Sequence, residues 1–298
     1  MDGAQEILQK IRRIELRTRR LVNTAVAGQY HSVFRGRGMN YEDVRPYQPG
    51  DDTRSIDWNV TARSGEPHVK IYTEERELTV LLAVDVSASG LFGSRSASKR
   101  EIAAEVAAVL AFSAIHNSDK VGALLFTSEV ELYIPPRKGR QHALRAIREI
   151  VFHSPCGTGT DIGNMLDFVN RVLSRRAVVF LLSDFISGDF SKPLAVTARK
   201  HDLIALRIED PVEAQLPDVG WITVEDAETG EQVELNTSSR RTRQEYESRQ
   251  KAQRTGVERL LRNHRVDLVS LATDADYFPA LRAFFKLRER RLAVRTGA

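Results

Sequence analysis

Three oxygen-bearing side chains alternate directly after an apolar run in the segment LLAVDVSASG, residues 81–90. Asp85, Ser87 and Ser89 can point the same way if the backbone there is extended, because alternate side chains of an extended chain share a side. A carboxylate and two hydroxyls are hard oxygen ligands, which suit Mg²⁺ or Mn²⁺. The serines could instead be nucleophiles, or ordinary turn and capping residues. The segment points to a metal site if more oxygen ligands lie near it.

Two later segments offer such ligands. Asp184 follows the apolar run AVVFLL, and the loop CGTGT, which precedes an expected helix, offers Thr158 and Thr160. We expect the ends of these segments along the C-terminal edge of one sheet, where open α/β sheets bind ligands. Asp161 is interpreted as a helix N-cap rather than a ligand. The predicted ligands of Mg²⁺ or Mn²⁺ are Asp85, Ser87, Ser89, Thr160 and Asp184.

The sequence lacks the usual patterns of catalytic or cofactor sites. No G-x-S-x-G elbow surrounds Ser87, the histidines are scattered, and the lysine in GSRSASKR lacks the second glycine of a Walker A loop. GTGTDIG follows no strand and is not a dinucleotide fingerprint. The single cysteine, Cys156, excludes an internal disulfide and a cysteine-based zinc site. We expect no catalytic residues and interpret the chain as a non-enzyme.

An alternation of strand and helix patterns positions the predicted ligands. The apolar runs LTVLLAV, VGALLF, AVVFLL, LIALRI and VDLVSLA are predicted strands, and VELYI is a candidate antiparallel edge strand. The helix SKREIAAEVAAVLAFSAIH opens with Ser98 and Glu101 at capping-box spacing. The pattern predicts an α/β fold with a doubly wound, mostly parallel sheet covered by helices on both faces.

Three parts of the chain follow different patterns. Residues 1–29 are predicted to form an N-terminal helix, residues 30–77 a β-rich segment, and residues 78–298 the α/β domain, interrupted by a β-hairpin at about 209–238. In the β-rich segment, Ile56, Trp58 and Val60 alternate as in a strand, and a second strand from Val69 is expected to continue into the run at 78–84. We expect the hairpin to pack with this segment as one small β-rich subdomain, because a lone hairpin is marginal in water.

Composition and charge indicate where the protein is located and which classes of partner are disfavoured. The 298 residues are 42% hydrophobic with a net charge of +4, as in a soluble globular protein. No apolar run approaches the roughly 20 residues of a membrane span, and the N-terminus lacks the apolar core of a secretory signal. We therefore predict a cytoplasmic protein without a membrane partner. The basic stretches at 10–20 and 240–265 contain one aromatic residue, Tyr246, so solvated helix faces are favoured over nucleic-acid binding.

The motifs resemble a known family. DVSAS, GTD and SD after apolar strands are similar to the metal-ion-dependent adhesion site of von Willebrand factor A-like domains. The run GRGMNYEDVRPYQPGDDTRSIDWNVTAR, followed by VKIYTEERELTVLLAVDVSAS, resembles the family called domain of unknown function 58, and the likeness covers nearly the whole chain. The resemblance implies an intracellular A-type domain in which Thr160, rather than Thr158, is the ligand. The family is often encoded beside MoxR-type AAA+ ATPases.

The function expected from these observations is metal-dependent protein binding. A divalent ion held partly by neutral hydroxyls stays electron-poor, so a carboxylate from a protein partner can complete its coordination. The resemblance implies an adaptor or co-chaperone of a MoxR-type AAA+ ATPase. Two alternatives stay open: a metal-dependent hydrolase, for which the sequence shows no general base, and a metal-free scaffold that uses its basic helices.

The segment RPYQPGDD and the residues after it allow two interpretations. Charged side chains in turns often form a structural salt-bridge cluster that fixes a loop. The same side chains could form a docking surface for a partner. The residues concerned are Arg45, Asp51, Asp52, Arg54 and Asp57.

Overall fold

The computed structural model describes residues 30, 33–34, 38–75, 77–94, 97–225 and 230–296. Its contacts divide the chain into two compact units, one of residues 34–78 and one that joins residues 1–33 to residues 79–298. The predicted N-terminal helix in residues 1–29 lies outside the described residues. Across the described ranges, no helix has both the length and the apolar character needed to cross a membrane.

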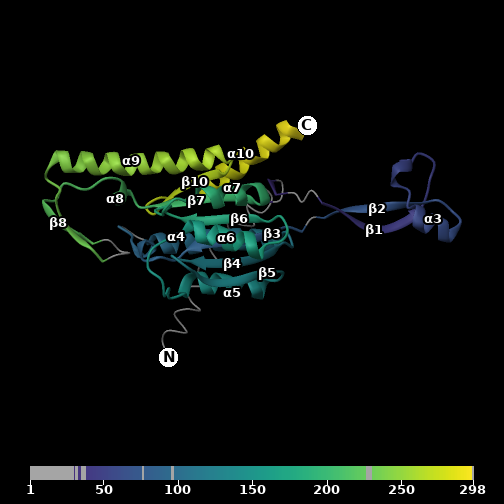
Figure 1. Ribbon diagram of the computed structural model, residues 1–298, viewed down its shortest axis with the longest axis horizontal. Coiled ribbons are helices and arrows are strands. Elements are labelled where there is room, and N and C mark those ends of the chain that lie inside the picture. The colour runs from purple at the N-terminus through teal and green to yellow at the C-terminus, as the bar shows by residue number, and fades with distance from the viewer. Residues whose placement is uncertain are drawn as a thin grey trace, which may run out of the picture. The chain divides into compact units, whose positions relative to one another are not determined.

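The larger unit contains a six-stranded sheet with the order β10-β7-β6-β3-β4-β5 (Figure 1). Its strands are β3 (Thr79–Asp85), β4 (Lys120–Phe126), β5 (Val130–Arg137), β6 (Val178–Ser183), β7 (Asp202–Glu209) and β10 (Asp267–Ala272). Every neighbouring pair is parallel except β4 with β5. The predicted mostly parallel sheet with an antiparallel edge strand is confirmed. The chain leaves β3 toward β4 and later returns to β6 on the other side, which makes the β3–β6 edge a topological switch point.

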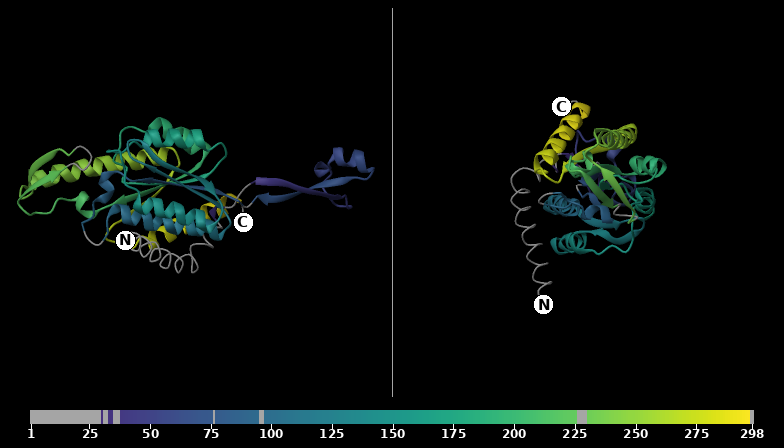
Figure 2. Two further views of the ribbon diagram at one scale, coloured as in Figure 1. Left: turned by 90° about the horizontal axis from the view of Figure 1, so that it is seen from below. Right: turned by 90° about the vertical axis from the view of Figure 1, so that its left-hand side faces the viewer.

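Helices cover both faces of this sheet, as expected for a doubly wound fold (Figure 2). Leu81 and Ala83 of β3 belong to one apolar core, whereas Val80 and Leu82 point to the opposite face and are equally buried. The helices that share the core of Leu81 are α6 (Ile162–Val172), α7 (Ser191–Lys200) and α9 (Arg240–Asn263). The other helices of the sheet are α4 (Lys99–His116), α5 (Arg140–Phe152) and α10 (Phe278–Thr296).

Side-chain caps fix where two of these helices begin. The Ser98 hydroxyl accepts from the backbone N–H of Glu101, and the Glu101 carboxylate accepts from the backbone N–H of Ser98. This is the predicted capping box, and it places Lys99 in the first turn of α4. Asp161 caps α6 by accepting from the N–H of Asn164, as predicted. Both helices therefore begin beside the C-terminal edge of the sheet.

The predicted hairpin forms, but not the subdomain it was expected to join. Strands β8 (Trp221–Glu225) and β9 (Gln232–Asn236) pair as a separate two-stranded sheet in the larger unit, between the short helix α8 (Pro211–Ala214) and α9. The β-rich segment has its own sheet in the other unit. The prediction of one shared subdomain is wrong, because the two sheets belong to different compact units. The two ends of the hairpin are joined to each other, since Thr237 Oγ1 donates to the carbonyl of Gly220 at 2.7 Å.

The unit of residues 34–78 is an antiparallel pair, β1 (Gly38–Pro46) with β2 (His68–Glu75). The strand predicted from the alternation of Ile56, Trp58 and Val60 is wrong, because Trp58 and Val60 belong to a helix, α3 (Trp58–Ser64). Asp57 caps that helix and Gly65, at φ +79°, ends it. The predicted continuation into the run at 78–84 is also wrong, since β2 ends at Glu75 and β3 begins at Thr79.

The charged segment of this unit forms part of the predicted structural cluster. The Arg45 guanidinium donates to both carboxylate oxygens of Asp51 at 2.7 Å, and it holds the pKa of Asp51 at about 2. Asp52 instead caps the short helix η2 (Thr53–Ser55) by accepting from the N–H of Arg54. These contacts fix the loop, and the docking interpretation stays a prediction.

A buried histidine makes the stability of the larger unit depend on pH. The side chain of His201, before β7, is 1% exposed, and its Nδ1 accepts from the N–H of Ala177. Burial, together with the charges of Lys200 and Arg176, lowers the pKa of His201 to about 4. The unfolded chain therefore takes up the proton first as the pH falls, so the stability contributed by neutral His201 is lost below the ordinary histidine pKa of about 6.5.

We therefore predict a different pH dependence for His201→Asn. Between about pH 7.5 and about pH 5, wild type should lose about 2 kcal/mol more unfolding free energy than the variant, because one pKa unit corresponds to about 1.4 kcal/mol. Urea denaturation of both proteins at each pH measures this difference. Parallel losses in the two proteins would contradict the prediction.

Candidate metal centre

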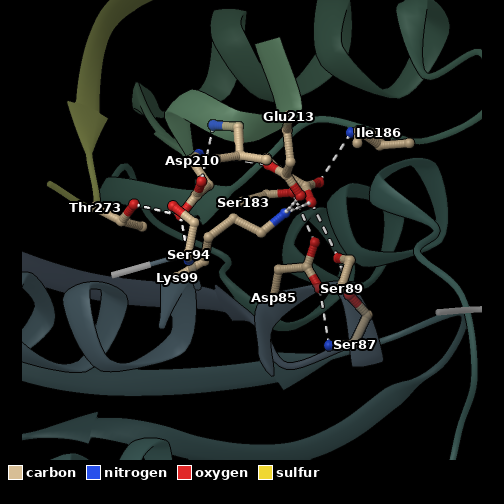
Figure 3. Close-up of polar contacts among 12 residues, drawn as sticks. Asp85, Ser87, Ser89, Ser94, Lys99, Ser183, Ile186, Asp210, Glu213 and Thr273 are labelled. Atoms are coloured by element: carbon tan, nitrogen blue, oxygen red, sulfur yellow. Dashed lines mark hydrogen bonds and ion pairs between the residues drawn. The ribbon is translucent and has the colours of Figure 1, made fainter. Parts of the chain in front are cut away.

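The ends of two neighbouring parallel strands hold the predicted carboxylates. Asp85 is the last residue of β3, and Asp184 directly follows β6. Ser87 and Ser89 follow β3, at the start of the short helix η3 (Ala88–Leu91). Figure 3 shows Asp85, Ser87 and Ser89 beside one another at this sheet edge. The β3–β6 switch point therefore carries four of the predicted ligands.

Hydrogen bonds link the predicted ligands. Ser89 Oγ donates to Asp184 Oδ2 at 3.0 Å and lies 3.1 Å from Ser87 Oγ. The N–H of Ser87 donates to Asp85 Oδ1 at 3.0 Å. Thr160, from the loop before α6, places Oγ1 3.3 Å from Asp85 Oδ2. The predicted convergence of these five residues is confirmed, and their role as metal ligands stays a prediction.

Ser183, the residue before Asp184, also belongs to the site. Its hydroxyl donates to Asp85 Oδ2 at 2.7 Å and accepts from the N–H of Phe185. Phe185 has φ +62°, a left-handed conformation that costs a non-glycine residue on the order of 1–3 kcal/mol. Its buried ring packs near Phe190, which helps to hold that conformation. The backbone that turns after Asp184 is thus strained and fixed by packing.

The raised pKa of Asp85 is consistent with a site for a cation. Burial, and secondly the nearby charge of Asp184, raise the pKa of Asp85 to about 6, although hydrogen bonds from Ser183 and Ser87 oppose the shift. The described residues contain no cluster of three or more His, Cys, Asp or Glu that could hold a metal. Two carboxylates with three hydroxyls nevertheless form an oxygen set that suits Mg²⁺ or Mn²⁺. The residues present therefore fit a divalent ion, whose positive charge would offset the repulsion between the carboxylates.

A carboxylate that sequence reasoning missed fixes the loop of Thr160. Glu131 of β5 accepts from the N–H groups of Gly157 at 2.7 Å and Cys156 at 3.1 Å, and from Thr127 Oγ1 at 2.8 Å. Burial opposes its charge, but these bonds outweigh burial and lower the pKa of Glu131 to about 2. A Cβ at Gly157 would lie 2.2 Å from Thr127 Oγ1, so the close approach requires glycine. No spacing in the sequence links residue 131 to residue 157.

We predict that Glu131→Gln weakens metal binding without removing a predicted ligand. A glutamine amide cannot accept all of these N–H and O–H groups, so the loop of Thr160 should lose its fixed position. The affinity for Mn²⁺ should fall about tenfold, as for outer-shell partners of metal ligands. Calorimetric titration with Mn²⁺ measures this change. The control is Glu129→Gln, which alters an exposed side chain two residues earlier; equal affinities of both variants would contradict the prediction.

Two further charged residues reach the site, and sequence reasoning missed both. Lys99 Nζ donates to Asp184 Oδ2 at 2.8 Å. It also donates to Glu213 Oε1 at 2.7 Å, and Figure 3 shows the Lys99 side chain beside Glu213. Burial opposes the ammonium charge, but both carboxylates outweigh it and raise the pKa of Lys99. A lysine in the first turn of a helix is electrostatically unfavourable, because the helix N-terminus is itself positive. This unfavourable position could have drawn attention to Lys99 in the sequence. The contact of Glu213 with Lys99 depends on the fold and has no such sequence signal.

Asp210 ties together the elements on the Lys99 side of the site. Its carboxylate accepts from the N–H of Ser94 at 2.9 Å, the hydroxyl of Thr273 at 2.7 Å and the N–H of Val212 at 3.0 Å. Figure 3 shows Asp210 between Thr273 and Ser94. Burial opposes its charge, but these bonds lower the pKa of Asp210 to about 2. The residue joins the loop before α4 to the end of β10 and caps α8, which carries Glu213.

Known sequences match most of the chain. A family model described as "Protein of unknown function DUF58" matches residues 43–256. "Uncharacterized protein Rv1480" of Mycobacterium tuberculosis is 33% identical over 283 residues, which cover 94% of this chain and 89% of the relative. "Uncharacterized protein Mb1516" of Mycobacterium bovis matches with the same identity and coverage.

Solved structures also resemble parts of the fold. The conserved hypothetical protein BatB from Bacteroides thetaiotaomicron matches with 16% identity and a TM-score of 0.46, over 73% of this chain and 99% of that chain. The SpRpn10 VWA domain matches with 12% identity and a TM-score of 0.37, over 69% of this chain and 93% of that chain.

Proposed function

We propose that this chain, which belongs to the DUF58 family as its sequence predicts, is a non-catalytic module that binds a carboxylate of a protein partner at a divalent-ion site. One observation carries the proposal. Oxygen side chains from β3, β6 and the loop before α6 converge at the switch point of the sheet, where Ser89 Oγ lies 3.0 Å from Asp184 Oδ2. Ligands of open α/β sheets bind at this place.

The five proposed ligands of Mg²⁺ or Mn²⁺ have different roles. Asp85 and Asp184 would supply the negative charge, and Ser87, Ser89 and Thr160 would supply neutral oxygens. A bound ion would offer its remaining coordination positions to an incoming carboxylate. Ser183 orients Asp85 through its 2.7 Å hydrogen bond, and Glu131 holds the loop of Thr160.

Exposed apolar side chains beside the site favour a protein as the partner. Leu91 lies two residues after Ser89 and is 63% exposed. Ile186 lies two residues after Asp184 and is 42% exposed, and Phe92 is exposed to the same extent. Exposed apolar side chains that gather beside a site often mark a protein-binding surface. We define these three residues as the apolar rim.

The partner proposed first is a MoxR-type AAA+ ATPase, for which this chain would be an adaptor or co-chaperone in the cytoplasm. This part of the proposal depends on the family resemblance, which implies an intracellular domain encoded beside such ATPases. The proposed ion and the apolar rim support one class of partner surface: an aspartate or glutamate flanked by apolar side chains.

We predict that the apolar rim contributes to partner binding but not to metal binding. Ile186→Asp should weaken capture of the purified MoxR-type ATPase encoded nearest to this chain by about tenfold or more, because it places a charge where an apolar contact is proposed. Mn²⁺ affinity should stay near that of wild type. The measurement is a pull-down in Mg²⁺ and in EDTA, with Val196→Asp as a control because Val196 is an exposed apolar residue of α7. Capture that is equal in EDTA and Mg²⁺ would contradict the proposed function.

A further inference from the structure

Lys99 places a buried cation at the proposed metal site. Its side chain is 2% exposed, and its ammonium group contacts Asp184 and Glu213 at once. Asp184 Oδ2, which accepts from Lys99, is also the atom that accepts from Ser89. The ammonium therefore occupies the carboxylate oxygen that joins the two strand-end loops.

The charges explain why this contact is stable without a metal. Asp85, Asp184 and Glu213 carry three negative charges, and Lys99 supplies one positive charge within hydrogen-bond distance of two of them. A buried carboxylate without a nearby cation is costly. Lys99 thus reduces the repulsion in the site. Asp85 instead accepts from the Ser87 N–H and from the hydroxyls of Thr160 and Ser183.

We propose that Lys99 is a resident cation that competes with the divalent ion for Asp184, and that Glu213 holds its ammonium when the ion binds. The inference rests on the proposed function, because it concerns regulation of the same site. Two like charges cannot share one carboxylate oxygen closely without strong repulsion. Entry of a divalent ion at Asp184 therefore requires the ammonium to withdraw.

The position of Glu213 makes a short withdrawal sufficient. Glu213 already accepts from Lys99 Nζ at 2.7 Å, so the ammonium keeps one charged partner after it leaves Asp184. The Glu213 side chain lies on α8 and is 28% exposed, which leaves it room to adjust. Asp210 caps that helix and fixes it near the site. Metal affinity is then determined partly by how well Glu213 holds Lys99.

Opposite changes in affinity test this competition. In titrations with Mn²⁺ alone, Lys99→Met should bind the ion about tenfold or more tightly than wild type, because the competing charge is gone. Glu213→Gln should bind it about tenfold more weakly, because Lys99 then depends on Asp184 alone. Glutamine still suits its position in the capping box of α8. Lys192→Met, which removes an exposed charge on α7, should bind as wild type does.

A double variant separates competition from a general loss of charge. If Glu213 acts through Lys99, Glu213→Gln should weaken Mn²⁺ binding far less in the Lys99→Met background than in wild type. A purely electrostatic effect of Glu213 would instead be the same in both backgrounds. Thermal melts show which variants are folded. If Lys99→Met does not fold, Lys99→Gln replaces it as the neutral variant in both backgrounds.

The outcomes distinguish this inference from the proposed function. If wild type binds Mn²⁺ through Asp85 but neither Lys99→Met nor Glu213→Gln changes the affinity, the competition is overturned and the metal site stands. If only Lys99→Met binds Mn²⁺, and Asp85→Ala in that background abolishes binding, the competition is supported and the metal-dependent function of wild type is overturned. If no folded protein binds Mn²⁺, both are overturned.

Discussion

Asp85→Ala is expected to abolish Mn²⁺ binding and metal-dependent partner capture while the protein stays folded. Asp85 contacts Ser183 and Thr160 and lies close enough to Asp184 to raise its own pKa, so it is central to the oxygen set. Outer-shell partners of a metal site contribute about 10- to 100-fold to affinity, and a charged ligand should contribute at least that much. Calorimetric titration should show a loss of about 100-fold or more.

The stability of the metal-free variant should stay close to that of wild type. The raised pKa of about 6 means that the ionised form of Asp85 is unfavourable in the folded protein. Above about pH 6, the ionised Asp85 carboxylate destabilises the folded protein by up to about 3 kcal/mol. Removing this charge therefore offsets the loss of the hydrogen bonds that Asp85 accepts.

Two variants serve as controls for Asp85→Ala. Ser87→Ala should reduce the affinity for Mn²⁺ less, because water can replace one neutral ligand. Asp167→Ala removes an exposed carboxylate of α6 and should bind the ion as wild type does. An Asp85→Ala protein that binds the ion and captures the partner like wild type would exclude the metal as the docking element.

Asp210→Ala should produce the largest loss of stability, about 3 kcal/mol or more in unfolding free energy. The buried carboxylate joins Ser94, Thr273 and Val212 from three elements, and its removal leaves their donors without this acceptor. The pKa of about 2 shows that these bonds favour the charged form. The stability that they contribute is therefore present above the ordinary aspartate pKa of about 4 and is lost as the pH falls toward about 2.

Urea denaturation at neutral pH measures the effect of Asp210→Ala, with Asp167→Ala as a matched control for an exposed aspartate. Asp210→Ala should also bind Mn²⁺ more weakly, because α8 loses its N-cap and holds Glu213 less firmly beside Lys99. A loss of less than about 1 kcal/mol, comparable to an ordinary surface substitution, would show that Asp210 does not join these elements.

The strand-end residues could be predicted because their place follows from topology. A buried parallel strand is recognised from its continuous apolar run, and the residue after it must lie at the C-terminal edge of the sheet. Asp85 and Asp184 follow such runs, and β3 and β6 are neighbours in the structure. The sequence thus indicated both the fold class and the five converging side chains.

The charged residues around the site could not be predicted in the same way. Glu131 precedes the loop that it holds by 26 residues, and Lys99 precedes Glu213 by 114. These pairings depend on how strands and helices pack, which no local spacing encodes. Only the unfavourable place of Lys99 at a helix start was visible in the sequence.

The error at residues 56–60 has a local cause. Ile56, Trp58 and Val60 alternate, but Asp57 and Gly65 are the N-cap and C-cap of a short helix, α3. In so short a segment, the capping residues carry more information than three alternating positions. The hairpin error differs, because the partner of a two-stranded sheet depends on tertiary contacts that its own sequence does not specify.

The most direct test of the metal site is the anomalous difference map of a crystal soaked with Mn²⁺. We predict a peak within direct or water-mediated reach of the side chains that converge at the β3–β6 switch point, which are those of Asp85, Ser87, Ser89, Thr160 and Asp184. A map at saturating Mn²⁺ with no peak at that edge, or with its only peaks elsewhere on the protein, would contradict the account.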